Sequence, residues 1–91
     1  MKVENTTGKG GSMRFTVAGQ SFDFTKEGVE ASMRGVQPEA IRLHAVEVGG
    51  VVYPVKQVLE RITKLDRLDF TSTTARRVVG KLGFRRFREA G

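Results

Sequence analysis

The chain has 91 residues, of which 16 are lysine or arginine and 10 are aspartate or glutamate, so its formal net charge is +6. This length fits one domain with a modest core and leaves little room for a deep catalytic cavity. The absence of cysteine excludes disulfides, a thiol nucleophile and cysteine-based metal sites. Because there is also no signal peptide or long apolar run, we expect a soluble, cytoplasmic protein that does not enter a membrane.

Positive charge is concentrated in one half of the chain. Residues 1–53 carry six basic and six acidic side chains, whereas residues 54–91 carry ten basic and four acidic ones. An excess of this kind favours a polyanionic partner, nucleic acid before membrane. A basic surface that is merely solvated is the simpler explanation of the same pattern.

The first twelve residues, MKVENTTGKGGS, are polar and glycine-rich and contain nothing to bury. They are expected to form a disordered arm, or to be a remnant of cloning ahead of a native start at Met13. Residues 13–91 are predicted to form a single α+β domain with a basic, helical C-terminal half.

The first hairpin is predicted from alternating apolar residues. Phe15 and Val17, then Phe22 and Phe24, alternate with polar residues, and the intervening Gly19-Gln20 is suited to a two-residue turn. Such a turn places Val17 opposite Phe22 and Phe15 opposite Phe24, with all four side chains on one face.

A short helix is predicted next, over about residues 26–34. Thr25 is suited to its N-cap, and Gly35 to the left-handed position that ends it. Val29, Met33 and Val36 recur at helical spacing and are expected to face the core.

The second hairpin, over residues 43–53, has the clearest strand pattern in the chain. A Gly49-Gly50 turn pairs Val48 with Val51 and Val46 with Tyr53 on one face. His44 falls on that same face.

Two helices are predicted to follow. The first has its apolar stripe within residues 55–65, with Pro54 at the first helical position. The second is capped by Thr71 and presents an apolar stripe of Ala75, Val78, Val79 and Leu82. Gly83 and Phe84 then suit a Schellman motif in which Phe84 folds back on Val79. The expected fold is two β-hairpins forming a small antiparallel sheet packed against about three helices, in the order ββ-α-ββ-α-α.

Groups suited to catalysis are scattered. His44 is the only histidine, and we interpret it as a structural or surface residue because no cysteine or second histidine could complete a metal site. Asp66 and Asp69 are expected to cap backbone N–H groups, and the segment 8–11 lacks the spacing of a phosphate loop. We therefore expect a protein that is not an enzyme, with no catalytic residues, no metal, no cofactor and no small-molecule substrate.

The last helix carries its basic residues away from the core. Thr73, Arg77 and Gly80 lie opposite the apolar stripe, flanked by Arg76 and Lys81. Gly80 costs the helix about 1 kcal/mol relative to alanine. It either allows a sugar-phosphate chain to approach closely or makes an ordinary packing contact, and the sequence leaves both open.

Arginines continue beyond this helix: Arg85, Arg86 and Arg88 interleave with phenylalanines. Their guanidinium groups suit phosphate oxygens and guanine edges. Phe87 could stack on a base, although a role in the core is favoured because so small a domain needs every phenylalanine for packing.

Helix starts offer a second kind of anion contact. Lys56 lies in the first turn of its helix, where free N–H groups also favour anions. Thr71, Ser72 and Thr73 begin the next helix, and their hydroxyls can donate to phosphate. The alternative is that these hydroxyls only cap the helix and Lys56 extends into water.

The two helices joined by residues 65–70 could form a helix-turn-helix in which the helix from Thr71 enters a major groove. The Gly49-Gly50 hairpin would then act as a wing, but it precedes the helix pair, whereas a standard winged helix has it afterwards.

A resemblance supports the same direction. The string Tyr53-Pro54-Val55-Lys56, followed by Phe70, Ala75-Arg76-Arg77 and Leu82-Gly83-Phe84, is similar to a Tyr-Pro-Pro-Lys … Leu-Gly-Phe module found beside McrA-type HNH restriction endonuclease domains in bacteria. The match covers about residues 47–84, Val55 replaces the second proline, and the nuclease histidines are missing. The resemblance implies a DNA-associated module without cleavage activity, with Lys56, Arg76 and Arg77 as contact residues.

The predicted function is non-catalytic nucleic-acid binding through phosphates, with DNA the expected partner and RNA an open variant. The predicted contact residues are Lys56, Thr71, Ser72, Thr73, Arg76, Arg77, Lys81, Arg85, Arg86 and Arg88. The alternative is an adaptor or inhibitor module that docks an acidic protein partner.

Overall fold

A computed structural model describes residues 12–41 and 43–88 of the chain. The expected arm or cloning remnant therefore lies outside the described residues, except for Ser12. In chain order, the elements are β1 (Met13–Val17), β2 (Gln20–Phe24), α2 (Lys26–Met33), β3 (His44–Val48), β4 (Val51–Pro54), α3 (Val55–Thr63), the 3-10 turn η1 (Arg67–Asp69), α4 (Ser72–Lys81) and β5 (Arg85–Arg88). The predicted α+β class is confirmed.

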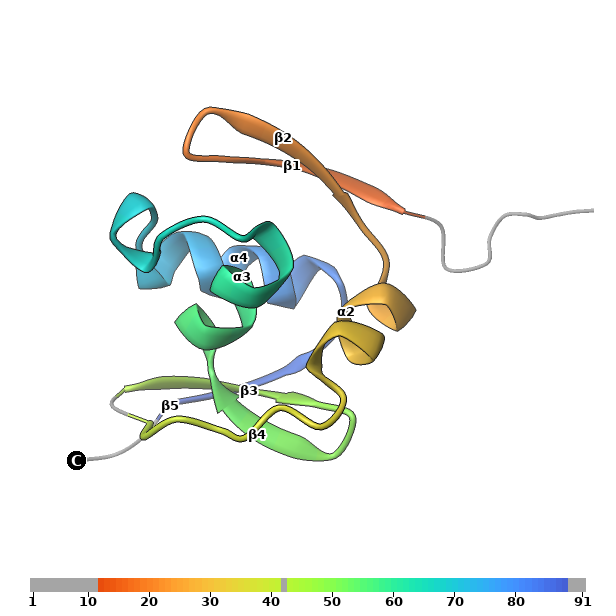
Figure 1. Cartoon of the computed structure of the whole chain (residues 1–91), viewed down its shortest axis with the longest axis vertical. Coiled ribbons are helices and arrows are strands. Elements are labelled where there is room, and N and C mark those ends of the chain that lie inside the picture. The colour runs from red at the N-terminus through yellow and green to blue at the C-terminus, as the bar shows by residue number, and fades with distance from the viewer. Residues whose placement is uncertain (1–11, 42, 89–91) are drawn as a thin grey trace, which may run out of the picture.

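The elements form three layers (Figure 1). A three-stranded antiparallel sheet, in the order β4-β3-β5, lies on one side of the helices, and the β1–β2 hairpin lies on the other. The two predicted hairpins therefore belong to separate sheets and do not join in one. The partner of the second hairpin is β5, which pairs with β3.

The first hairpin has its turn one residue earlier than predicted. Ala18 and Gly19, with φ of 53° and 77°, form the turn, so that Phe15 pairs with Phe22 and Val17 with Gln20. Positive φ at both central residues gives a turn whose twist matches that of the strands. Because the register shifts by two residues on one strand, the four apolar side chains still share a face, as predicted.

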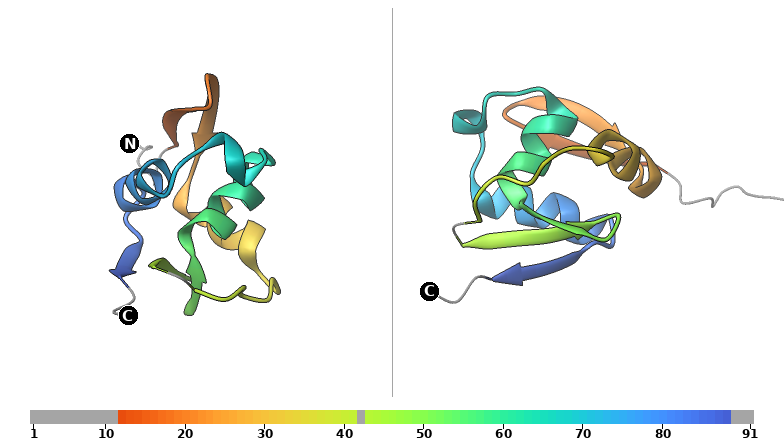
Figure 2. Two further views of the ribbon diagram at one scale, coloured as in Figure 1. Left: turned by 90° about the vertical axis from the view of Figure 1, so that its left-hand side faces the viewer. Right: turned by 60° about the horizontal axis from the view of Figure 1, so that its bottom comes forward.

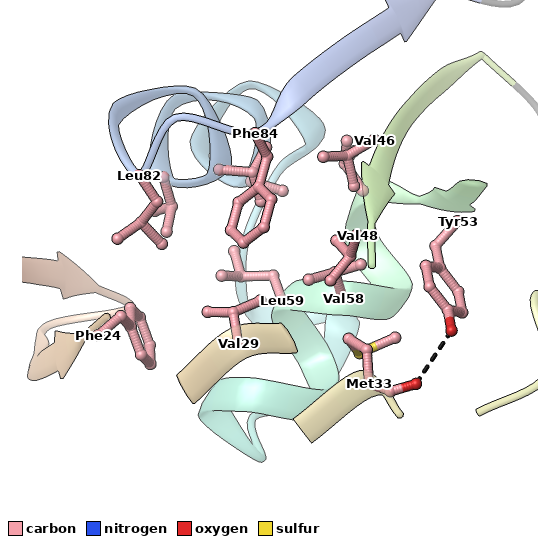
Figure 3. Close-up of a cluster of buried hydrophobic side chains, with 14 of the residues drawn as sticks. Phe24, Val29, Met33, Val46, Val48, Tyr53, Val58, Leu59, Leu82 and Phe84 are labelled. Atoms are coloured by element: carbon pink, nitrogen blue, oxygen red, sulfur yellow. Dashed lines mark hydrogen bonds between the residues drawn. The ribbon is translucent and has the colours of Figure 1, made fainter. Parts of the chain in front are cut away.

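The second hairpin has the predicted register. Val48 pairs with Val51 and Val46 with Tyr53 across the Gly49-Gly50 turn. Val46, Val48 and Tyr53 are all at most 2% exposed. The Tyr53 hydroxyl lies 3.0 and 2.9 Å from the carbonyl oxygens of Met33 and Val36, so its single proton ties the end of α2 to the sheet (Figure 3).

The helix ends follow local capping chemistry. Thr25 Oγ1 accepts from the Gly28 N–H at 2.9 Å, and Thr71 Oγ1 accepts from the Thr74 N–H at 3.1 Å, so both predicted N-caps are confirmed. Pro54 is the N-cap of α3 and still part of β4, one position earlier than predicted.

The predicted Schellman motif ends α4. Gly83 has φ of 94°, the Phe84 N–H donates to the Val79 carbonyl at 3.1 Å, and the Gly83 N–H donates to that of Gly80 at 3.1 Å. This reversal of chain direction connects the end of α4 directly to β5.

The core lies between the sheet and the hairpin, and all three helices contribute to it (Figure 3). The stripe predicted on α4 is buried, as are Val29 and Met33 of α2. Phe87 is absent from this cluster, so its favoured assignment to the core is wrong: it lies on the opposite face of the sheet, paired with Ala45.

Candidate nucleic-acid interface

Helix α4 and strand β5 lie side by side at one edge of the molecule (Figure 2). Alternation along β5 divides its side chains between the two faces of the sheet. Arg86 and Arg88 pair with Val46 and His44 and point to the side occupied by α4. Arg85 and Phe87 consequently point to the other side.

Arg86 packs directly onto α4 at Gly80. A Cβ at position 80 would stand only 2.8 Å from the Arg86 guanidinium carbon, and Arg86 Nη1 donates to the Arg76 carbonyl oxygen at 3.4 Å. Of the two roles considered for Gly80, the structure thus shows a packing contact. The space above this glycine is taken by an arginine of the same chain.

Three arginines and a histidine gather at this junction. Arg76 of α4, Arg86 and Arg88 of β5, and His44 of β3 are referred to below as the arginine cluster. Burial, together with the positive charges of Arg76 and Arg88, lowers the pKa of His44 below its ordinary value of 6.5. His44 is therefore neutral at pH 7.

Within the described ranges, no acidic side chain forms an ion pair with this cluster. The ion pairs among the described residues join Arg14 to Asp23 and Arg67 to Glu39 and Glu60. In addition, His44 Nδ1 and Arg76 Nε are buried and have no hydrogen-bond partner within the part of the chain that the structure describes. Among the described residues, the cluster therefore gathers like charges beside two buried nitrogens that have no hydrogen-bond partner.

The remaining predicted contact residues spread away from the cluster. Arg77, Lys81 and Thr73 are exposed on the outer side of α4. Arg85 lies on the opposite face of the sheet from Arg86, 5.3 Å from the centroid of the Phe87 ring. The predicted residues thus do not all form one wall.

Lys56, Ser72 and Thr71 lie around the start of α4. Lys56 is in the first turn of α3, as predicted, but its ammonium lies 6.0 Å from the centroid of the Phe70 ring and does not simply extend into water. Ser72 is partly buried, and the Thr71 hydroxyl is engaged as the cap and also contacts the Thr74 hydroxyl. The observed role of Thr71, at this threonine-rich helix start, is therefore to cap α4.

A cavity of about 460 Å³ joins Lys56 and Ser72 to His44. Its further lining residues are Glu39, Ala40, Leu43, Pro54, Val55 and Arg67. Arg67 binds both oxygens of Glu39 at 2.8 and 3.0 Å and also pairs with Glu60, which lowers the pKa of Glu39 and raises that of Arg67. The positive charge of Arg67 is therefore neutralised by carboxylates of the same chain.

Sequence reasoning missed His44 as a member of the cluster, and it missed Arg67 as a structural residue. The signal for His44 was present, since it falls on the same face as Val46, but its neighbours could be identified only once β5 was placed against β3. Asp66 was assigned correctly, because its Oδ1 accepts from the Leu68 N–H at 2.8 Å.

The described residues form a small α+β domain. The family model described as SCO5918-like matches residues 13–90, and the chain belongs to that family. No curated protein and no solved structure gives a significant match. Among the described residues, no helix has the length and apolar character to cross a membrane.

Proposed function

We propose that this protein is a non-catalytic nucleic-acid-binding module that contacts phosphates through α4 and β5, with DNA as its partner. The observation that carries the proposal is the arginine cluster, in which Arg76, Arg86 and Arg88 meet without an acidic neighbour among the described residues. A phosphate between α4 and β5 would relieve their mutual repulsion and give the unsatisfied nitrogens a partner.

Arginines on two elements suit a polymer better than a single anion. The outer side of α4 extends the cluster with Arg77 and Lys81, so successive phosphates could be met along the helix. The proposal includes a cytoplasmic location, and the resemblance to the McrA-associated module remains a prediction that agrees with it.

A basic edge strand favours one alternative. Among the described strands, β5 pairs with β3 alone, and an extended acidic segment of a protein partner could add to its other edge. Such an adaptor would bind protein with little or no affinity for oligonucleotides, and RNA in place of DNA would be a variant of the main proposal.

The test is a fluorescence-anisotropy titration of a labelled duplex with the full chain and with the double variant Arg77→Gln/Arg88→Gln. Both side chains are exposed, and neither makes a hydrogen bond or ion pair among the described residues. Removal of two phosphate contacts should weaken binding by about tenfold or more at low salt.

The matched control is Arg34→Gln/Lys64→Gln, which removes the same charge from exposed positions outside α4 and β5. The control should retain affinity within about twofold, since only the general field changes. Equal losses in the two double variants would contradict the proposed surface, and no binding of any oligonucleotide by the unaltered chain would contradict the function.

A further inference from the structure

The outer face of the β4-β3-β5 sheet carries a phenylalanine that the core does not use. The described helices lie on the other face of this sheet (Figure 1). In the register, Phe87 stands beside Ala45, which in turn stands beside Pro54. The next row across the strands contains Arg85, Glu47 and Val52.

The row of Phe87, Ala45 and Pro54 forms an apolar strip on the outer face of the sheet. Ala45, at the centre of this row, is only 2% exposed although it points outward. Phe87 and Pro54 remain partly exposed, and Val52 of the next row is 37% exposed. An aromatic ring beside short apolar neighbours is accessible to a flat group laid upon it.

The guanidinium group of Arg85, a flat cation, lies near the Phe87 ring. The guanidinium carbon of Arg85 lies 5.3 Å from the centroid of the Phe87 ring. The arginine cluster begins on the adjoining residues of the same strand, because Arg86 and Arg88 alternate with Arg85 and Phe87. A ligand that passes around this edge strand would therefore meet Phe87 and Arg85 on the outer face of the sheet and the arginine cluster on the opposite face.

We propose that single-stranded nucleic acid passes around the edge of the sheet at β5, with a base stacked on Phe87, a neighbouring phosphate held by Arg85 on the same face, and further phosphates held by the arginine cluster on the opposite face. This inference rests on the proposed function and names the form of nucleic acid that the edge takes. Stacking needs an exposed base face, which a single strand offers and an intact duplex hides within its base stack. Charge alone would not discriminate between the two forms.

The first test places a probe at the ring itself. The chain contains no tryptophan, so the indole fluorescence of a Phe87→Trp variant, excited at a wavelength that Tyr53 does not absorb, reports on position 87. Addition of a single-stranded thymidine or uridine oligonucleotide should quench this fluorescence as a base stacks on the indole. A Phe22→Trp variant in the β1–β2 hairpin provides the matched control, and its emission should not change.

The second test removes only the aromatic ring. Phe87→Leu keeps an apolar side chain, and it should weaken single-strand binding by about tenfold while changing duplex binding less than about twofold. Circular dichroism verifies that Phe87→Leu is folded. If Phe87→Leu does not fold, the Phe87→Trp titration still tests the stacking proposal.

The outcomes separate this inference from the function on which it rests. Oligonucleotide binding without quenching at position 87, or equal losses of single-strand and duplex binding in Phe87→Leu, would overturn the stacking proposal and leave phosphate binding standing. Failure of the unaltered chain to bind either form would overturn both. Quenching by either the thymidine or the uridine oligonucleotide supports the inference.

Discussion

At the scale of single residues, the basic edge depends on how Gly80 and Arg86 fit together. A glycine in the middle of a helix is unfavourable by about 1 kcal/mol relative to alanine. Here its missing side chain admits the Arg86 guanidinium, which approaches a Cβ position to 2.8 Å and is thereby held beside Arg76. Gly80 thus positions the guanidinium of Arg86. Gly83, three residues later, has a different role, because its φ of 94° lies in the left-handed region that favours glycine.

We therefore expect Gly80→Ala to separate stability from binding. The guanidinium is the mobile end of an exposed side chain and can move aside, so the free energy of unfolding should stay constant or rise by up to about 1 kcal/mol. Nucleic-acid affinity should fall severalfold because Arg86 is displaced. Urea denaturation and anisotropy measure the two effects.

Gly83→Ala is the contrasting variant, expected to lose about 1–2 kcal/mol of stability because alanine is strained in the left-handed region. A loss of more than about 1 kcal/mol in Gly80→Ala would show that Arg86 is locked in place and contradict the first expectation.

A second prediction concerns the protonation of His44. Its pKa is lowered by burial and then by Arg76 and Arg88, while Lys56 and the ionised Glu39 line the adjoining cavity. A bound phosphate would favour the imidazolium and raise this pKa, so binding takes up a proton. Affinity should therefore increase as the pH falls from about 7.5 through 6.5 to 5.5, and a His44→Gln variant should show a flatter profile.

Stability of the free protein should change in the opposite direction. The pKa of His44 is lower in the folded chain than in the unfolded one, so the unfolded state binds the proton more readily. The His44 contribution to stability is complete above about pH 6.5 and declines as the pH falls below that value.

For the binding prediction, an affinity that does not increase on acidification would show that no phosphate lies beside His44.

At the scale of elements, the segment between α2 and β3 is fastened by one buried amide. Gln57 of α3 is 7% exposed, its Oε1 accepts from the Glu39 N–H at 2.9 Å, and its Nε2 donates to the Gln37 carbonyl at 2.9 Å. Both groups of the side chain are thus used to hold backbone that belongs to no regular element. This segment also forms one wall of the cavity beside Lys56.

Replacement of this amide should loosen the segment. Gln57→Met keeps the length and bulk of the side chain but leaves two backbone groups without partners, which should cost about 2 kcal/mol in the free energy of unfolding. The control is Gln37→Met, an exposed position at which the change should be within about 0.5 kcal/mol. Similar values for the two variants in urea denaturation would argue against this role of Gln57.

At the scale of the whole molecule, charge is unevenly distributed. Residues 1–53 are neutral overall, and the net charge of +6 comes from residues 54–91. These residues include α3, α4 and β5, of which α4 and β5 form the basic edge. Part of the charge is neutralised internally, since Arg67 is bound to Glu39 and Glu60.

Salt should therefore weaken binding steeply. If about four phosphates are contacted, log K for a duplex should fall with log salt concentration at a slope of about −3.6, which is about a hundredfold loss between 50 and 200 mM salt. The Arg77→Gln/Arg88→Gln variant should show a shallower slope by about 2, because two contacts are gone. A slope near zero for the unaltered chain would contradict a phosphate-based interface.

The sequence by itself determined the features that depend on near neighbours. The α+β class, the caps Thr25 and Thr71, the reversal at Gly83 and the register of the second hairpin were all predicted correctly. Caps, turns and helical stripes are formed within a few residues of one another, so composition and spacing are sufficient to indicate them.

Only the tertiary structure decided how the C-terminal arginines are arranged. β5 pairs with a strand about forty residues earlier in the chain, and four arginine-rich residues carry no local signal for that pairing. The pairing turns Arg86 and Arg88 toward α4 and Phe87 outward, and it pairs His44 with Arg88, whose positive charge together with that of Arg76 lowers the pKa of His44. Long-range pairing depends on which surfaces meet after the local elements have formed, and that information is not contained in the spacing of neighbouring residues.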